Sequence, residues 1–456
     1  MKVSQGVDHV GIIKPSVETA TGGFALDQLN RWSVRSWFII GVLITTQYAG
    51  ALNGAILVIS MESLKLELGL TDSQIGFLLS LPGICAGVGA LILGYLADRA
   101  PRQIVLAVCI LLWSFATIGL GLATQFIGIL LGIVALAFGE SAIGPVVNSI
   151  VPDLFSKQTR VKVNLILAGA GTIAGGLAAM AAGNLIALVD TNLISLKEYL
   201  AVSSGVRGAF LIAGLLGLPI ALIVLVVGKI KRQTHNLEVS SNFPNYIRRH
   251  GKALLGLYSA FAIQAAGISA LATWIPTYLG RRFEISAAEV GSAFGKSVIA
   301  GSILGILLSL TLTHLISQKY GQRTSYIIYF SGLLTAIIPT ALQLTADNQN
   351  MALYCIFFSV TLLTMGGGHT ASMIQDVSPS QLRGRLFAFL TLFMSVIPAA
   401  APSVVGLISD GLSDSSMGLI KSICTVSLSC FLLSALVLSK SRNSIFSAMN
   451  DNQKTY

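Results

Sequence analysis

Apolar residues in this chain gather in long runs that short polar connections separate. Each run is about 20 to 27 residues long, which is the length that a helix needs to cross roughly 30 Å of hydrocarbon. The runs cover residues 37–61, 75–96, 104–122, 126–151, 163–189 and 209–228, followed by 253–279, 290–316, 325–344, 351–374, 386–408 and 417–438. The pattern predicts an all-α integral membrane protein with twelve transmembrane helices.

A polar, basic stretch at residues 229–252 divides these runs into two groups of six. We therefore expect a tail at residues 1–36, a six-helix bundle at 37–228, a linker at 229–252, a second bundle at 253–438 and a second tail at 439–456. Two similar halves around a midplane site are the plan of a carrier that exposes this site to each side of the membrane in turn. The pattern thus favours an alternating-access transporter.

Composition and charge support the membrane interpretation. Hydrophobic residues make up 54% of the chain and charged residues 11%, against about 25% charged residues in soluble domains. The net charge of +10 would indicate nucleic acid in a soluble protein, but most of the 29 Lys and Arg residues lie in the tails and the even-numbered connections. Such a bias predicts that both termini are cytoplasmic. The first run follows a long polar tail, so we interpret it as a retained span and not as a secretory leader.

Motifs for other chemistries are missing or incomplete. The five cysteines all lie in apolar runs without a CxxC pair, so we expect no metal site. The segment from Gly291 to Ser297 is one residue short of a phosphate loop and follows no strand, so ATP binding is not expected. We predict no enzymatic activity, no cofactor, no nucleic-acid partner and a monomer in the lipid bilayer. No Asn-x-Ser/Thr acceptor occurs, which favours a bacterial inner membrane.

One connection resembles a known signature. The residues after the second run read Gly94-Tyr-Leu-Ala-Asp98-Arg99-Ala-Pro-Arg102, which resembles the loop between the second and third helices of the major facilitator superfamily. The resemblance implies a conformational latch formed by Gly94, Asp98, Arg99 and Arg102 on the cytoplasmic side. Gln103 replaces the last basic residue of the family pattern.

Further segments resemble the Spinster-type branch of that superfamily, which is associated with lysolipids and sphingoid amphiphiles. They lie at residues 67–76, 139–160, 274–279, 382–385 and 406–410. The branch has an Asp-Arg pair in its first span, where this chain has Asn53 and Gly54, and an arginine in its fourth span, where this chain has Ile133. The resemblance therefore implies that Glu140 lacks its usual partner.

Three ionisable residues lie inside predicted spans, where a charge is costly and is by default a functional candidate. Glu140 is a candidate proton carrier or partner of a cationic substrate, with a structural hydrogen bond as the alternative. Lys296 is a candidate partner of an anionic substrate or of Glu140, unless it extends toward the membrane surface. His369 follows three glycines and is a candidate titrating group or an ordinary interfacial residue.

Polar and aromatic residues in the spans are softer candidates for the wall of a substrate cavity, or for hydrogen bonds between helices. They are Gln47, Tyr48, Asn53, Asn164, Tyr258, Gln264, Trp274 and Thr364. Glycines at small-xxx-small spacing in residues 169–183 indicate a close helix contact, which is either static or slides during transport.

The sequence thus predicts a secondary transporter of a small organic solute, an organic anion being one such solute. A Spinster-like carrier of lysolipids or sphingoid amphiphiles is one alternative. A membrane sensor or partner protein that kept the fold without transporting is the other.

Overall fold

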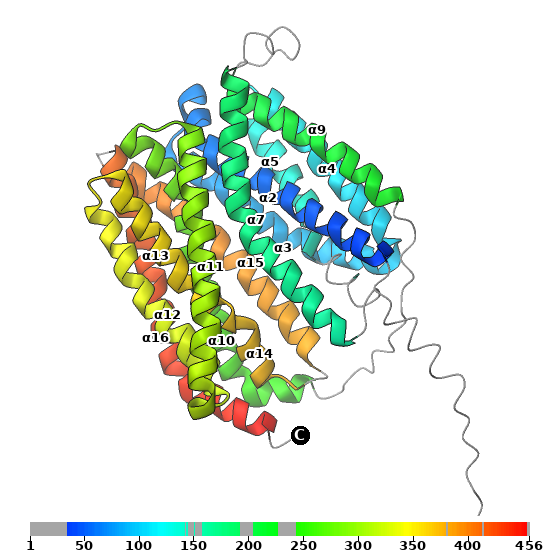
Figure 1. Ribbon diagram of the computed structural model, residues 1–456, viewed down its shortest axis with the longest axis vertical. Coiled ribbons are helices and arrows are strands. Elements are labelled where there is room, and N and C mark those ends of the chain that lie inside the picture. Colours follow the sequence, from blue (N-terminus) through cyan, green and yellow to red (C-terminus); the bar gives the residue numbers. More distant parts are fainter. Residues whose placement is uncertain are drawn as a thin grey trace, which may run out of the picture.

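The chain is almost entirely helical in a computed structural model, which describes residues 34–141, 143–144, 150, 157–191, 204–226, 243–379, 382–412 and 415–453. Figure 1 shows long helices that run roughly side by side. The first half contributes α2 (Val34–Leu68), α3 (Asp72–Arg99), α4 (Arg102–Leu122), α5 (Phe126–Glu140), α7 (Lys157–Thr191) and α9 (Gly205–Val226). The second half contributes α10 (Phe243–Phe283), α11 (Ala287–Tyr320), α12 (Arg323–Leu342), η1 (Gln343–Thr345), α13 (Gln349–Gly367), α14 (His369–Val377), α15 (Arg383–Asp410) and α16 (Ser415–Gln453).

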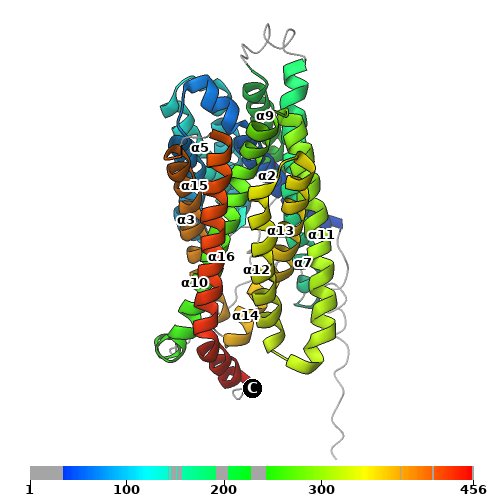
Figure 2. The same ribbon diagram turned by 90° about the vertical axis from the view of Figure 1, so that its left-hand side faces the viewer.

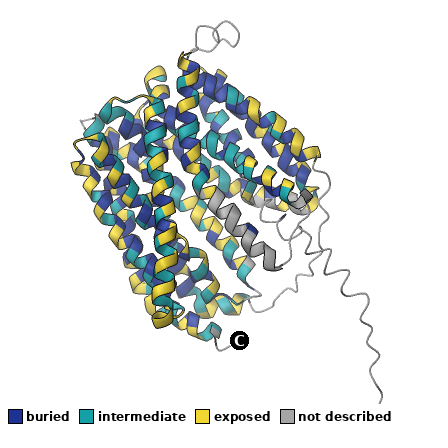
Figure 3. Cartoon of the chain, in the orientation of Figure 1, coloured by how far each residue is buried: buried dark blue, intermediate teal, exposed yellow. Residues whose placement is uncertain are grey.

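The helices carry apolar surface on their outer faces. Ten of the described helical segments are long and apolar enough to cross a membrane, and α5 is a shorter apolar helix. Leu131, Leu222, Leu310 and Leu407 are each more than 60% exposed, and Figure 3 shows exposed positions along the outer helices. In water such a surface would drive aggregation, whereas in a bilayer it meets lipid chains.

Local sequence determines where the helices begin and end. Gly69 has a φ of +63°, which ends α2, and Thr71 caps α3 by accepting a hydrogen bond from the Gln74 amide. The predicted tenth span is interrupted, because α13 ends at Gly367 and α14 begins at His369. Consecutive glycines weaken the helix at this point. The helices α10 and α16 extend beyond the predicted spans into the expected linker and tail.

Two of the helix pairs that join the halves form the most extensive contacts. Figure 2 shows α3 beside α15 on one side of the molecule and α7 beside α11 on the other. On α3, a Cβ atom at Gly76 would overlap the carbonyl oxygen of Pro402. On α7, a Cβ atom at Gly183 would overlap the carbonyl oxygen of Ala287, and Gly291 lies equally close to Ala179. The helix backbones therefore touch directly where α3 meets α15 and where α7 meets α11.

We expect Gly183→Leu to lower the free energy of unfolding by about 1–3 kcal/mol, because the new side chain must push α7 and α11 apart. The measurement is the apparent melting temperature of the detergent-purified protein. Gly171→Leu is the control on the same helix, since a Cβ atom at Gly171 meets nothing within 4 Å. Equal melting temperatures for the two variants would contradict the close contact.

Candidate functional site

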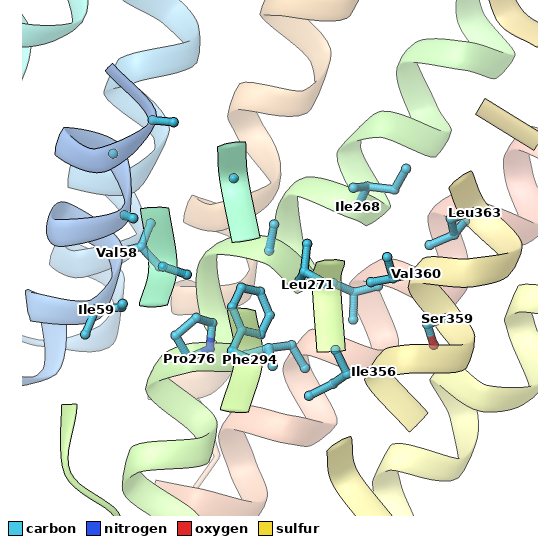
Figure 4. A pocket seen from close by; sticks show the side chains of 18 of the residues that line it. Val58, Ile59, Ile268, Leu271, Pro276, Phe294, Ile356, Ser359, Val360 and Leu363 are labelled. Carbon is cyan, nitrogen blue, oxygen red and sulfur yellow. The ribbon is translucent and has the colours of Figure 1, made fainter. Parts of the chain in front are cut away.

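A central cavity of about 400 Å³ lies between the two halves. Its wall comes from α2 and α7 of the first half and from α10, α11, η1 and α13 of the second half. Figure 4 shows apolar side chains projecting into it, among them Val58, Leu271 and Phe294. Among the described residues of the wall, only Gln343 and Ser359 contribute polar side chains, and none is charged. The cavity therefore matches an apolar molecule with few polar groups.

Glu140 ends α5 next to α2. Its side chain forms a hydrogen bond with Asn53, which is buried on α2. The Oε1 atom of Glu140 is buried and has no hydrogen-bond partner within the described part of the chain. Asn53 directly precedes Gly54, which lines the cavity. The structure thus joins two of the predicted site residues beside the cavity wall, although Glu140 does not itself line it.

The position of the missing family arginine is filled by packing. Ile133 lies on α5 and is completely buried. Glu140 consequently has a neutral amide partner where the resemblance implies a guanidinium. Compared with the family pattern, isoleucine in place of arginine removes a charge pair from the interior. The buried side chain of Ile133 occupies the position instead.

Lys296 does not lie where an anion-binding role in the cavity would require. It is exposed on α11 and lines a shallow outer hollow with Asn184, Glu289 and Gln349. The central cavity does not include it. The expected pairing of Lys296 with Glu140 is not among the ion pairs of the described residues. A long side chain on an outer face can place its ammonium near the polar membrane surface.

His369 is a buried packing residue at the start of α14. Its Nε2 atom lies 3.0 Å from the hydroxyl of Ser309 on α11, and its Nδ1 atom lies 3.3 Å from the hydroxyl of Ser325 on α12. Because these groups satisfy both ring nitrogens, His369 links three helices within the second bundle and does not face the cavity.

The polar and aromatic candidates of the spans differ in whether they form hydrogen bonds between helices. Tyr258 donates to the carbonyl of Leu386 at 2.8 Å, and Trp274 donates to the carbonyl of Pro402 at 3.1 Å. Both bonds fasten α10 to α15. The remaining candidates are Gln264, which accepts from Tyr329, then Gln47 and Tyr48, which are half-buried on α2, Thr364, which is half-buried on α13, and Asn164, whose side chain lies outside the described residues.

An ionic network that the sequence did not predict joins the halves where α2 ends and α3 begins. Arg281, at the end of α10, donates to Glu62 on α2 at 2.6 and 3.1 Å. It also donates to Asp72, the first residue of α3, at 3.0 and 3.1 Å. The side chains of Arg281 and Asp72 are only 9% and 5% exposed. A guanidinium of the second bundle is therefore held by two carboxylates of the first.

A third carboxylate, Asp410 of α15, completes this network. Asp410 accepts from the backbone amides of Asp72 at 2.9 Å and Ser73 at 2.8 Å, and from the Ser73 hydroxyl. The neighbouring Ser409 hydroxyl donates to Asp72 at 2.7 Å. A carboxylate at a helix N-terminus satisfies free amides and complements the helix dipole. We call Glu62, Asp72, Arg281, Ser409 and Asp410 the interbundle clamp.

Asp72 is ionised over a wide pH range. It precedes the apolar part of α3, and burial opposes its ionisation. The hydrogen bonds from Arg281, Lys65 and Ser409 outweigh burial and lower its pKa from 3.8 to about 2. The clamp is thus charged at every physiological pH.

The expected latch lies at the opposite end of α3. Arg99 stacks its guanidinium over the ring of Tyr95 at 4.1 Å. The surroundings of Gly94 and of the Asp98 side chain lie outside the described residues, and Arg102 begins α4. The role of Gly94, Asp98, Arg99 and Arg102 as a conformational latch stays a prediction.

The fold and sequence relate this chain to known membrane carriers. The sequence model of the Major Facilitator Superfamily matches residues 38–402. The chain belongs to this superfamily. The predicted family and the fold class of twelve transmembrane helices are confirmed. The chain is a multi-pass membrane protein and a secondary transporter of a small organic solute.

Individual relatives are distant. An "MFS-type efflux pump" of Mycolicibacterium smegmatis is 25% identical, with 83% of this chain and 86% of that protein covered. The "Sphingosine-1-phosphate transporter SPNS2" of Danio rerio is 25% identical, with 75% and 70% covered. The crystal structure of a bacterial homolog of the lysosomal transporter Spinster, inward-facing and unoccupied, has a TM-score of 0.76 at 17% identity, covering 92% of this chain and 98% of that chain. The last similarity concerns the fold alone.

We expect Arg281→Gln to lower the apparent melting temperature markedly, because it leaves Glu62 without its cation and Asp72 with Lys65 alone. Breaking a buried ion pair typically costs about 3–5 kcal/mol. Arg249→Gln is the matched control, since Arg249 pairs with Asp451 but its side chain is 71% exposed. Such exposed pairs contribute about 0–1 kcal/mol.

The pH profile separates the clamp from a general loss of packing. Because the folded pKa of Asp72 lies below its ordinary value of 3.8, its contribution to stability is complete above about pH 4 and is lost as the pH falls through 2. In Arg281→Gln the folded pKa of Asp72 should rise toward its ordinary value, so this loss of stability in acid should be smaller. Parallel profiles of the variant and the unaltered protein would contradict this assignment.

Proposed function

We propose that the central cavity is the substrate site and that it carries an apolar or amphiphilic organic molecule. The supporting observation is the wall of the cavity, whose described residues are apolar except for Gln343 and Ser359. An organic anion would need a cation in the wall, and Lys296 lies outside it. The distant relatives named for efflux and for sphingosine-1-phosphate transport are consistent with such a substrate.

The clamp is proposed as the gate on the outer side of the membrane. The Lys and Arg bias places both termini in the cytoplasm, and hence the end of α2 and the start of α3 outside. We propose a bacterial inner membrane as the location and a monomer as the transporting unit. In each cycle Arg281 releases Glu62 and Asp72 so that the cavity opens outward, while the latch at Asp98 and Arg99 holds the opposite side.

Glu140 is proposed as the proton-coupling residue. Its carboxyl group is hydrogen-bonded to the neutral Asn53, and its buried Oε1 atom has no hydrogen-bond partner among the described residues. A carboxyl group whose partner is a neutral amide can take up and release a proton at a lower free-energy cost than one that is ion-paired with a guanidinium. Coupling arises if substrate binding changes the surroundings of this group.

We expect Gly54→Leu to abolish binding of an amphiphilic probe, because the leucine side chain enters the open space of the cavity. A Cβ atom at Gly54 meets nothing within 4 Å. The measurement is equilibrium binding of tritiated 1-decanol to the protein in nanodiscs, corrected with protein-free nanodiscs. Gly119→Leu on α4, exposed and outside the cavity, is the matched control.

Benzoate serves as the competing small anion in the same experiment. Lys296→Gln should leave 1-decanol binding unchanged. If benzoate binds instead of 1-decanol and its binding disappears in Lys296→Gln, the protein is an organic-anion carrier and the assignment of the cavity is wrong.

We expect the protein to exchange protons with an unbuffered solution when 1-decanol binds, and Glu140→Gln to lose this exchange. A soluble pH indicator reports it. The control is Glu289→Gln, which removes an exposed carboxylate on α11 that pairs with its own helix cap. Proton exchange that persists in Glu140→Gln would assign the coupling to another group.

A further inference from the structure

One end of the central cavity carries its two polar side chains. Gln343 begins η1 directly after α12, and Ser359 lies on α13. Both are only 2% exposed. The Oε1 atom of Gln343 has no hydrogen-bond partner among the described residues. A buried carbonyl oxygen without a partner is unfavourable unless a ligand supplies a donor.

The hydroxyl of Ser359 is also an acceptor toward the cavity. Its Oγ atom lies 3.2 Å from Oγ1 of Thr340. The Thr340 hydroxyl donates its single proton to the carbonyl of Ala336 at 2.8 Å. Thr340 can therefore only accept from Ser359, and this bond uses the one proton of Ser359. The Ser359 oxygen can then form further hydrogen bonds only as an acceptor, through its lone pairs.

The charge of the wall excludes the ionic alternatives. A carboxylate or phosphate could accept from the amide NH2 group of Gln343, but it would lose its hydration in a wall whose described residues include no cation. An ammonium group brings donors, but it would lose its hydration where the described wall residues include no carboxylate. A neutral hydroxyl group supplies a donor without either cost.

We propose that this end of the cavity recognises an uncharged hydroxyl group, which donates to Gln343 or Ser359 while an apolar chain extends along Leu271 and Phe294. The substrate is then a neutral, hydroxyl-bearing amphiphile. This inference depends on the proposed function of the cavity. Gln343 is the specificity-determining residue, since its Oε1 atom has no hydrogen-bond partner among the residues that the structure describes.

The test compares ligands of one chain length that differ in their polar group. Tritiated 1-decanol is displaced from the full chain in nanodiscs by unlabelled 1-decanol, decyl methyl ether, decanoate or decylammonium. We expect 1-decanol to bind about tenfold more tightly than the ether, which can accept but not donate. The two ions should displace still less.

Matched variants assign this preference to its residue. In Gln343→Leu, which keeps the volume and removes the acceptor, the preference for alcohol over ether should fall to about threefold or less. Adding Ser359→Ala should remove it. Gln103→Leu makes the same change at another buried glutamine, outside the central cavity, and should retain the full preference. Far-ultraviolet circular dichroism and the melting temperature establish that each variant is folded.

The outcomes separate the inference from the proposed function. Equal binding of alcohol and ether, or strongest binding of decanoate, overturns the hydroxyl assignment if Gly54→Leu still abolishes binding. A preference for alcohol that survives both substitutions at Gln343 and Ser359 overturns it as well. If Gly54→Leu leaves binding intact, the cavity is not the substrate site and the proposed function fails first.

Discussion

The two halves of this protein meet in a solvent that gives apolar helices little reason to associate. Lipid chains are as apolar as leucine side chains, so helices must be held by close backbone contact and by polar bonds. The structure uses both. Glycines bring α7 against α11 and α3 against α15, and the interbundle clamp adds Arg281 between two carboxylates of the opposite half. These contacts lie around the cavity. They hold the helices together without closing the space between the apolar side chains of its wall.

The sequence predicted the elements well because lipid imposes a strict rule on them. Backbone groups in hydrocarbon must bond within their own segment, so run length alone indicates a span. The break between α13 and α14 and the extensions of α10 and α16 escaped this rule. Helix ends depend on caps and on contacts with neighbouring helices, which a hydropathy pattern does not contain.

The candidate site was predicted less completely. Glu140 and Asn53 were each named as candidates, but their hydrogen bond to one another was not predicted and is seen only in the structure. Lys296 was misplaced as a cavity residue, because an apolar run does not show which face of α11 meets lipid. The clamp was missed since Glu62 and Arg281 stand near span ends, where charges are ordinarily solvated. The capping of α3 by Asp410 joins residues more than 300 positions apart, and no local signal marks it.

The backbone contact between α7 and α11 also bears on the speed of transport. Where Gly183 faces the first turn of α11, and Gly291 faces α7, no side chain stands between the helices. Displacement along this part of the contact rearranges few side chains, although Ile299 packs at Gly176 and Met180 at Gly295 further along the same helices. At the clamp, by contrast, several charge-assisted bonds must break nearly together. The activation barrier of the cycle should therefore lie in breaking the bonds of Arg281. The contact between α7 and α11 should be the pivot about which the halves turn.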